Sequence, residues 1–286
     1  MSRTLSCVLL ACASLFISVV GLVAPLMGAE ADLGPLTMSY EHVAWPALES
    51  VLKDLRAADE ETRGRALALM GVPQGPGSND FGAVAETILR YATLGDKETL
   101  QAIIGVRQGP MVSGAVATQR DHRWERIAAF SCWCKYERGD LLGEFIRIEP
   151  AFGNREELVL RASDGGTGIY SQQEARFSYR RDALHLVFTF VSHRRTCDPT
   201  QPFCQVERRW FYVNYWDSVA GGVLVESRFK IFPKVDPKPE FDSVQELEIA
   251  RAGNFSCKTY RWDQETFRYV AFVAPTNPCK LHLTAK

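Results

Sequence analysis

Leu184-His-Leu-Val-Phe-Thr-Phe190 is the stretch of sequence that decides the fold class of this chain. Leu or Phe occupies every second position, and His185, Val187 and Thr189 stand between them. An alternation with period two, in residue types that favour extended backbone, is typical of a β-strand with one buried face. We therefore expect a strand over 184–190.

The same signals recur through the second half of the chain. Further strand-like segments are expected at 158–160, 205–215, 222–231, 244–249 and 267–271. Turn-forming residues separate them, at Asp164–Gly168, Ala220–Gly222 and Pro233–Pro239. Short strands divided by such turns indicate antiparallel pairing. The sequence therefore predicts an antiparallel β domain over 120–286, built as a sandwich or a meander.

A tyrosine followed closely by an aspartate recurs in this half of the chain. The four instances are Tyr136/Asp140, Tyr179/Asp182, Tyr215/Asp217 and Tyr260/Asp263. We expect each aspartate to cap a hairpin turn through backbone amides and each tyrosine to pack across the hairpin. Because the units recur about every 40 residues, a small propeller-like ring of hairpin units is the alternative architecture.

The N-terminus resembles a secretory signal. One basic residue, Arg3, precedes an uncharged stretch from Thr4 to Met27, and Ala29-Glu-Ala31 supplies small residues for cleavage. We expect residues 1–31 to be the signal peptide of a secreted, periplasmic or cell-envelope protein. An uncleaved membrane anchor is the second interpretation because the apolar stretch is long. A lipoprotein box at Leu9–Cys12 is the third.

Residues 32–110 are expected to form a small helical region, with helix predicted across 44–106. Apolar residues recur at Leu48, Val51, Leu52 and Leu55, the spacing of a helix with one buried face. A second helix is expected to start at the N-cap Asp59 and to end at Gly71. Small residues, Gly and Pro between 105 and 119 mark the expected boundary with the β domain.

Residues 47–72, with Asp59-Glu-Glu-Thr-Arg63 and Ala66-Leu-Ala-Leu-Met-Gly71, resemble one helix pair of a HEAT-type repeat. Gln101–Val106 partly echoes Leu67–Val72. HEAT arrays are protein-binding scaffolds, so the resemblance implies a role in protein binding. A small helical bundle packed on its neighbour is the other interpretation, because repeat proteins need about three or more units to bury a continuous core.

Eight cysteines are present, and cleavage of the signal removes Cys7 and Cys12. An even number remaining in an exported chain predicts disulfides. From proximity we expect pairs between Cys197 and Cys204 and between Cys257 and Cys279. Cys132-Trp-Cys134 raises the alternative of a redox pair or a soft-metal site. The favoured interpretation is that these two cysteines bridge to distant partners.

Several function classes find no support in the sequence. A net charge of −1 gives no electrostatic basis for binding nucleic acid. The five histidines lack metal-ligand spacing, and no serine stands in a nucleophile elbow, so neither a metal nor a cofactor is expected. Asp164-Gly-Gly-Thr-Gly168 fails both phosphate-loop patterns and is expected to be a hairpin loop.

Arginine doublets flank the expected strands, and tryptophans stand near them. Arginine and aromatic residues dominate binding patches. The predicted binding residues are Arg180, Arg181, Arg208, Arg209, Trp210, Trp216 and Trp262. The sequence favours an exported, non-enzymatic binding module for a protein or glycan partner. The alternative is an envelope enzyme, either a thiol-redox enzyme using Cys132 and Cys134 or a carboxylate hydrolase.

Overall fold

The computed structural model describes residues 33–72, 84–95, 99–134, 142–151, 155–166, 168–216, 219–231 and 255–273. These residues belong to one compact unit that starts at Leu33. The expected signal at 1–31 and the expected strand at 244–249 lie outside the described residues.

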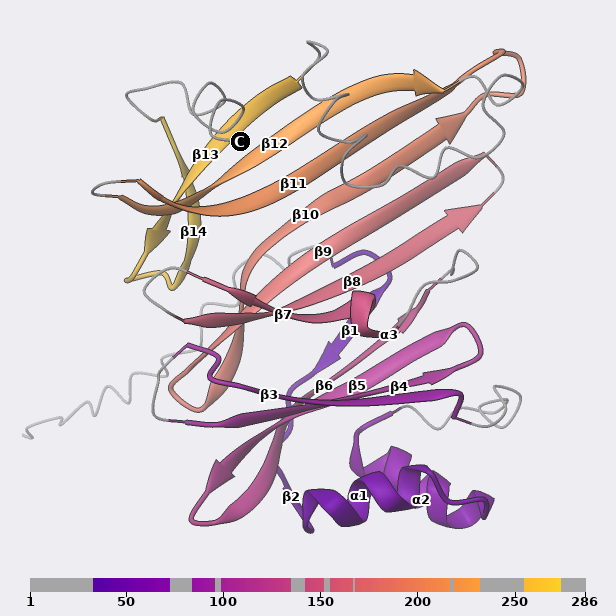
Figure 1. The fold of residues 1–286 in the computed structure, drawn as a ribbon, viewed down its shortest axis with the longest axis vertical. Helices are drawn as coiled ribbons and strands as arrows, with labels where there is room; N and C mark the ends of the chain where they lie inside the picture. The colour runs from indigo at the N-terminus through magenta and orange to yellow at the C-terminus, as the bar shows by residue number, and fades with distance from the viewer. Residues whose placement is uncertain are drawn as a thin grey trace, which may run out of the picture. The chain divides into compact units, whose positions relative to one another are not determined.

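The described residues form antiparallel sheets with a few short helices (Figure 1). The helices are α1 (Leu48–Leu55), α2 (Glu60–Leu69) and α3 (Leu142–Phe145). The first strands are β1 (Leu36–Ser39), β2 (Val43–Trp45), β3 (Glu86–Ala92), β4 (Gln101–Gln108), β5 (Met111–Arg120) and β6 (Arg123–Trp133). The later strands are β7 (Ile146–Pro150), β8 (Glu156–Gly166), β9 (Ile169–Arg180), β10 (Ala183–Cys197), β11 (Cys204–Trp216), β12 (Val219–Ile231), β13 (Phe255–Asp263) and β14 (Arg268–Phe272).

From β3 to β6 and from β7 to β14, strands that follow one another in the sequence pair with one another, whereas β1 and β2 pair with β6. The first sheet has the order β1-β6-β5-β4-β3, and β2 also pairs with β6. The second sheet has the order β14-β13-β12-β11-β10-β9-β8-β7. The predicted antiparallel β pairing is therefore confirmed, and the strand order of the second sheet is that of a meander. The hairpins join one continuous sheet rather than separate blades, so the propeller-like alternative does not describe them.

The prediction of helix across 44–106 is wrong for its second half, where β3 and β4 form. Gln101–Val106, the expected echo of a repeat helix, lies inside β4 and is buried at every position. Ile104 packs toward α1 and α2, whereas Ile103 packs toward the second sheet. A strand buried on both faces shows no alternation, so its apolar run cannot be told from a buried helix.

The expected boundary between 105 and 119 is also not seen. β4, β5 and β6 pair residue by residue across this stretch, from Gln101↔Thr118 to Met111↔Trp133. The small residues that suggested a linker are strand residues. Gly114 in β5 is one of them, and a Cβ there would lie 2.2 Å from the ring of Phe130.

The helices α1 and α2 form as predicted and cover one face of the first sheet (Figure 1). Asp59 caps α2 by accepting a hydrogen bond from the Thr62 amide at 2.8 Å. Gly71 ends α2 with φ of +75°, and the amide of Val72 donates to the Leu67 carbonyl at 3.0 Å. This pair of features is a Schellman C-cap, which requires glycine at the left-handed position.

One hydrophobic cluster joins the two sheets. Ile103, Ile127 and Phe130 contribute from the first sheet, and Leu158 and Phe177 contribute from the second. All five side chains are buried. Burial of this apolar surface is the main term that stabilises the contact between the sheets.

An aromatic cluster forms within the second sheet. β10 carries two bulges, between Leu186 and Phe188 and between Val191 and His193. Bulges bend a strand and increase its twist. Phe188 packs 4.3 Å from Phe211 of β11 and 5.8 Å from Tyr269 of β14, measured between ring centroids. The end of the sheet at β14 therefore folds back to contact β10.

Candidate functional site

The structure brings together only part of the predicted binding patch. Arg180 at the end of β9 and Trp262 in β13 both contact Phe267. Arg181 is exposed in the β9–β10 turn, and Arg208 and Arg209 lie in β11 away from Trp262. Trp210 is partly buried in β11, and the side chain of Trp216 lies outside the described residues. Arg180 and Trp262 are thus brought together, whereas Arg208 and Arg209 lie further along the sheet.

The contacts around Trp262 define what we call the arginine–aromatic surface: Arg155, Arg180, Trp262 and Phe267. The guanidinium of Arg155 lies 3.9 Å from the ring centroid of Trp262. The guanidinium of Arg180 lies 4.9 Å from the ring centroid of Phe267. The rings of Trp262 and Phe267 meet edge to face at 5.0 Å. Stacking on an aromatic face holds a planar guanidinium in place. Phe267 is buried, whereas Arg155, Arg180 and Trp262 are partly exposed.

The β13–β14 hairpin positions this surface. Asp263 ends β13 and accepts from the Glu265 amide at 3.0 Å and from the Thr266 hydroxyl at 2.8 Å. Phe267 follows with φ of +52°, a left-handed conformation that is rare for a bulky residue. Strained backbone of this kind is concentrated at functional sites. The Arg180 side chain reaches the same turn and donates to the Gln264 carbonyl at 2.9 Å.

Sequence reasoning missed Arg155 and Phe267 as members of this surface. Phe267 was assigned only a strand role, and Arg155 stands outside any recognised pattern. His185, which alternates along β10, also joins the site: its ring lies 5.6 Å from Phe267, edge to face. The β10–β14 contact that brings these residues together depends on tertiary folding, so no local sequence signal marks it.

The arginines of β11 have different surroundings. Arg209 Nε donates to Glu226 at 2.9 Å, and Arg228 Nε lies 2.7 Å from the same carboxylate. These contacts lower the pKa of Glu226 against the opposing effect of its burial. Arg209 therefore belongs to a salt-bridge network along β11 and β12, which is a structural role.

His193 stands at the centre of a basic cluster at the other end of β10. It pairs with Arg208 of β11 and with Gln172 of β9 in the strand register. Its ring meets Tyr170 edge to face at 5.3 Å. Burial, followed by the positive charges of Arg208, Arg195 and Arg161, lowers the pKa of His193 to about 3. The imidazole is therefore neutral at physiological pH.

A buried ion network lies between β7, β8, β9 and β14. Arg176 donates to Glu157 at 3.1 Å and also pairs with Glu149. Glu157 accepts from the Tyr269 hydroxyl at 2.9 Å. Burial raises the pKa of Glu157 and of Tyr269, and the charge of Glu157 adds to the effect on Tyr269. Glu157 is fully buried, and its contacts with Arg176 and Tyr269 fasten β14 to β8 and β9.

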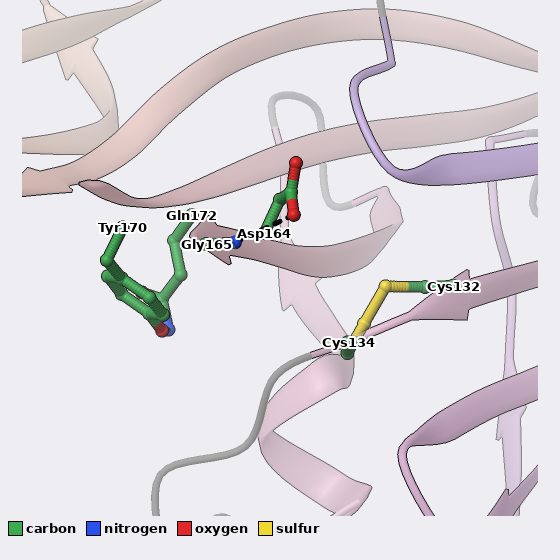
Figure 2. The surroundings of a disulfide bond; sticks show 6 residues. All are labelled: Cys132, Cys134, Asp164, Gly165, Tyr170 and Gln172. Atoms are coloured by element: carbon green, nitrogen blue, oxygen red, sulfur yellow. Dashed lines mark hydrogen bonds between the residues drawn. A yellow bond between two sulfur atoms is a disulfide. The ribbon is translucent and has the colours of Figure 1, made fainter. Parts of the chain in front are cut away.

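The disulfides agree only in part with expectation. Cys197 and Cys204 are joined as predicted and close the β10–β11 turn. Cys257 is disulfide-bonded, and its expected partner Cys279 lies outside the described residues. The expectation that Cys132 and Cys134 bridge to distant strands is wrong, because they are joined to each other (Figure 2).

The Cys132–Cys134 disulfide lies at the end of β6. Cys132 pairs with Val112 and Leu36 in the sheet, and the amide of Cys134 donates to the Pro110 carbonyl at 3.0 Å. Only 4% of Cys132 and 0% of Cys134 is exposed, and both belong to the core between the sheets. Thiol exchange requires access of a thiolate to sulfur. The even number of cysteines in an exported chain suggested distant bridges, but a count does not say which cysteines pair.

The recurrent tyrosine and aspartate serve their hairpins in two ways. Asp263 caps its turn through a backbone amide, as predicted. Asp182 instead accepts from the Tyr179 hydroxyl at 3.0 Å and pairs with Arg120. Tyr136 and Asp217 lie outside the described residues. Both described aspartates are engaged in turns, which leaves them poorly placed as a hydrolase pair.

Two further features bear on function. Among the described residues, no cluster of His, Cys, Asp or Glu side chains is arranged to hold a metal ion. The described helices are too short or too polar for a membrane span. Asp164–Gly166 ends β8 and β9 begins at Ile169, so this segment joins a hairpin as expected.

The chain matches no protein-family model, no curated protein and no solved structure.

Proposed function

We propose that this protein is an exported, non-enzymatic binding module that takes an acidic partner at the arginine–aromatic surface. The observation that carries the proposal is the stacking of Arg155 on Trp262 beside Arg180 on Phe267. Planar guanidinium groups held on rings are suited to carboxylate and sulfate groups, which accept two parallel hydrogen bonds. An acidic glycan or an acidic segment of a protein has this chemistry.

Export is part of the same proposal. The N-terminal sequence has the pattern of a secretory signal. The Cys197–Cys204 disulfide and the bonded Cys257 fit an oxidising compartment. A partner outside the cytoplasm follows from this location.

The test is binding of the mature chain to immobilised alginate, a polyuronate, and to polyglutamate, an acidic peptide. We expect one of the two polymers to bind and the binding to weaken as salt rises. Arg180→Asn removes one guanidinium of the surface and is expected to raise the Kd about tenfold, the effect of one charge-assisted hydrogen bond. Arg181→Asn is the matched control, since it removes the same charge from the neighbouring exposed turn.

Equal effects of Arg180→Asn and Arg181→Asn would mean that only net charge matters, and the proposed surface would be wrong. Binding of neither polymer would remove the acidic-partner proposal. Preference for alginate identifies a glycan partner, and preference for polyglutamate identifies a protein partner.

A thiol-redox enzyme is the second candidate function because Cys132 and Cys134 pair with each other. Their burial counts against it, since an exchange partner cannot reach either sulfur without opening the core. Reduction of a small disulfide substrate by the reduced protein, lost in a Cys132→Ala, Cys134→Ala double variant that folds, would establish this candidate. We expect no such turnover.

A further inference from the structure

The side chain of His193 has an unusual position for a polar group. Only 8% of the residue is exposed, and within the described part of the chain its Nε2 atom is buried without a hydrogen-bond partner. A buried polar atom left unpaired destabilises the folded state. Such an atom in a folded protein calls for an explanation, and contact with a bound ion is one.

The surroundings of His193 are positive. Arg208 stands opposite it on β11, Arg195 follows two residues later on β10, and Arg161 approaches from β8. Arg161 pairs with Glu174 at 2.9 Å, and the same carboxylate also pairs with Arg147. Among the described residues, no carboxylate forms a salt bridge with Arg195, whose guanidinium lies 5.9 Å from the Tyr170 ring centroid. Arg195 therefore brings to His193 a positive charge that no salt bridge among the described residues balances.

We propose that the His193 cluster binds a small oxyanion, a sulfate, phosphate or carboxylate group, with Arg195 and His193 as its main ligands. An anion offsets the repulsion among the arginines, which are held together in a partly buried place. Guanidinium presents parallel N–H donors that match an oxyanion. The neutral imidazole keeps one N–H, which Nε2 donates in one of its two tautomers.

A metal cation does not fit the same place. Guanidinium groups have no lone pair to offer, and their charge repels a cation. The site also differs from the arginine–aromatic surface, because it is built on Arg161, Tyr170, His193 and Arg195. The inference therefore stands independently of the proposed function.

The test is an isothermal titration calorimetry experiment in which sodium sulfate is added to the mature chain. Sodium chloride holds the ionic strength constant. We expect saturable sulfate binding that weakens about tenfold in Arg195→Gln, the loss of one charge-assisted hydrogen bond. Arg194→Gln is the matched control, because Arg194 is the exposed neighbour of Arg195. In the strand register Arg194 lies opposite Ser171 of β9. Its affinity for sulfate should equal that of the wild type.

Parallel titrations with phosphate, acetate and a sulfated oligosaccharide distinguish a free ion from an acid group on a larger ligand. The ring resonances of His193 in the wild type provide a readout that needs no variant, and we expect them to shift with the same Kd. Unshifted resonances, or equal weakening by Arg194→Gln and Arg195→Gln, would overturn the proposal. Arg195→Gln should leave binding of the acidic polymers unchanged, so the two proposals can fail separately.

Discussion

The guanidinium of Arg120 lies 2.7 Å from the carboxylate of Asp182, joining a hairpin of the first sheet to a hairpin of the second. Arg120 ends β5, and Asp182 sits in the β9–β10 turn with φ of +66°. The side chain of Arg120 is 39% exposed and that of Asp182 is 68% exposed. An ion pair exposed to this degree stabilises a protein by at most about 1 kcal/mol. The turn conformation of Asp182 is therefore expected to matter more than its charge.

Two substitutions at Asp182 separate these effects. Asp182→Asn removes the charge but tolerates the left-handed backbone, so we expect it to lower the free energy of unfolding by less than about 1 kcal/mol. Asp182→Ala adds backbone strain and is expected to cost a further ~1 kcal/mol. Urea denaturation of both variants measures the difference. Equal losses would show that the ion pair, not the turn, is the larger contribution.

Arg126 is expected to be a strong determinant of stability. It is 3% exposed, donates to the Leu69 carbonyl at the end of α2 at 2.7 Å, and pairs with Glu41 at 2.6 Å. Arg126→Gln takes one of two donors from the Leu69 carbonyl, which keeps the Trp45 indole N–H at 3.2 Å, and removes the ion-pair partner of Glu41. Because Arg126 itself is buried, we expect a loss of about 2–4 kcal/mol in urea denaturation. A loss below about 1 kcal/mol would mean that water replaces the guanidinium at both acceptors.

Gly71 gives a second test of the same contact. A Cβ at this position would lie 2.6 Å from Arg126 Nη1, and φ of +75° disfavours any other residue. Gly71→Ala is therefore expected to lower the free energy of unfolding by more than about 1 kcal/mol, through strain and displacement of Arg126. Gly64, in the middle of α2 with no atom within 4 Å of its Cβ position, is the control. Gly64→Ala should stabilise the helix instead.

These elements also show how far the sequence predicts the fold. Alternating residues such as Leu184–Phe190 identified β10, and Asp59 and Gly71 marked the ends of α2, because each signal is local. The strand β4 was missed, because it packs Ile103 against one layer and Ile104 against another. Burial on both faces removes the period that identifies a strand. Which elements cover a segment is decided by tertiary packing.

Acid sensitivity is expected from His193. An unfolded histidine binds a proton near pH 6.5, whereas His193 in the folded chain does so only near pH 3. Between these values the unfolded state holds the additional proton, so the free energy of unfolding falls as pH falls. The slope is at most about 1.4 kcal/mol for each pH unit. We expect urea denaturation to show a larger loss from about pH 7 to pH 5 in the wild type than in His193→Gln.

Carboxylates such as Glu174, whose pKa is lowered by Arg147 and Arg161 against the effect of burial, also lose their contribution in acid. The wild type and His193→Gln share this loss, so the difference between their pH dependences reports on His193 alone. Identical pH dependence in the wild type and His193→Gln would show that the folded histidine titrates near its ordinary pKa.

The two described disulfides are expected to stabilise the protein unequally. Cys197–Cys204 closes a longer loop than Cys132–Cys134, with sequence separations of 7 and 2. Loop-closure entropy gives about 2.5 kcal/mol for the first and about 1.5 kcal/mol for the second. Because Cys132 and Cys134 are buried, their bond should also be reduced more slowly by dithiothreitol in the native protein. Alkylation and mass spectrometry follow each pair, and faster reduction of Cys132–Cys134 would favour the redox candidate.

The candidate site was predicted less well than the fold. Arg180 and Trp262 were identified by residue type, since arginine and tryptophan favour binding surfaces. Their partners Arg155 and Phe267 come from other strands and loops, and the contact of β14 with β10 brings them together. Arg209 has the right residue type but is held by Glu226. The residue types that favour a binding surface can be identified from a sequence. Which arginine contacts which ring or carboxylate depends on strand register and on bends in the strands.

The central claim is that the arginine–aromatic surface binds an acidic partner. The most direct measurement is a titration of the ¹⁵N-labelled mature chain with the acidic polymer that it binds, following the indole Nε1–H of Trp262. This group donates to Gln264 at 2.9 Å, beside the carbonyl that Arg180 contacts, and Trp262→Phe assigns its signal. We predict that the Trp262 signal shifts in a saturable manner and that the shift is lost in Arg180→Asn. An unchanged Trp262 signal during saturable binding would contradict the account.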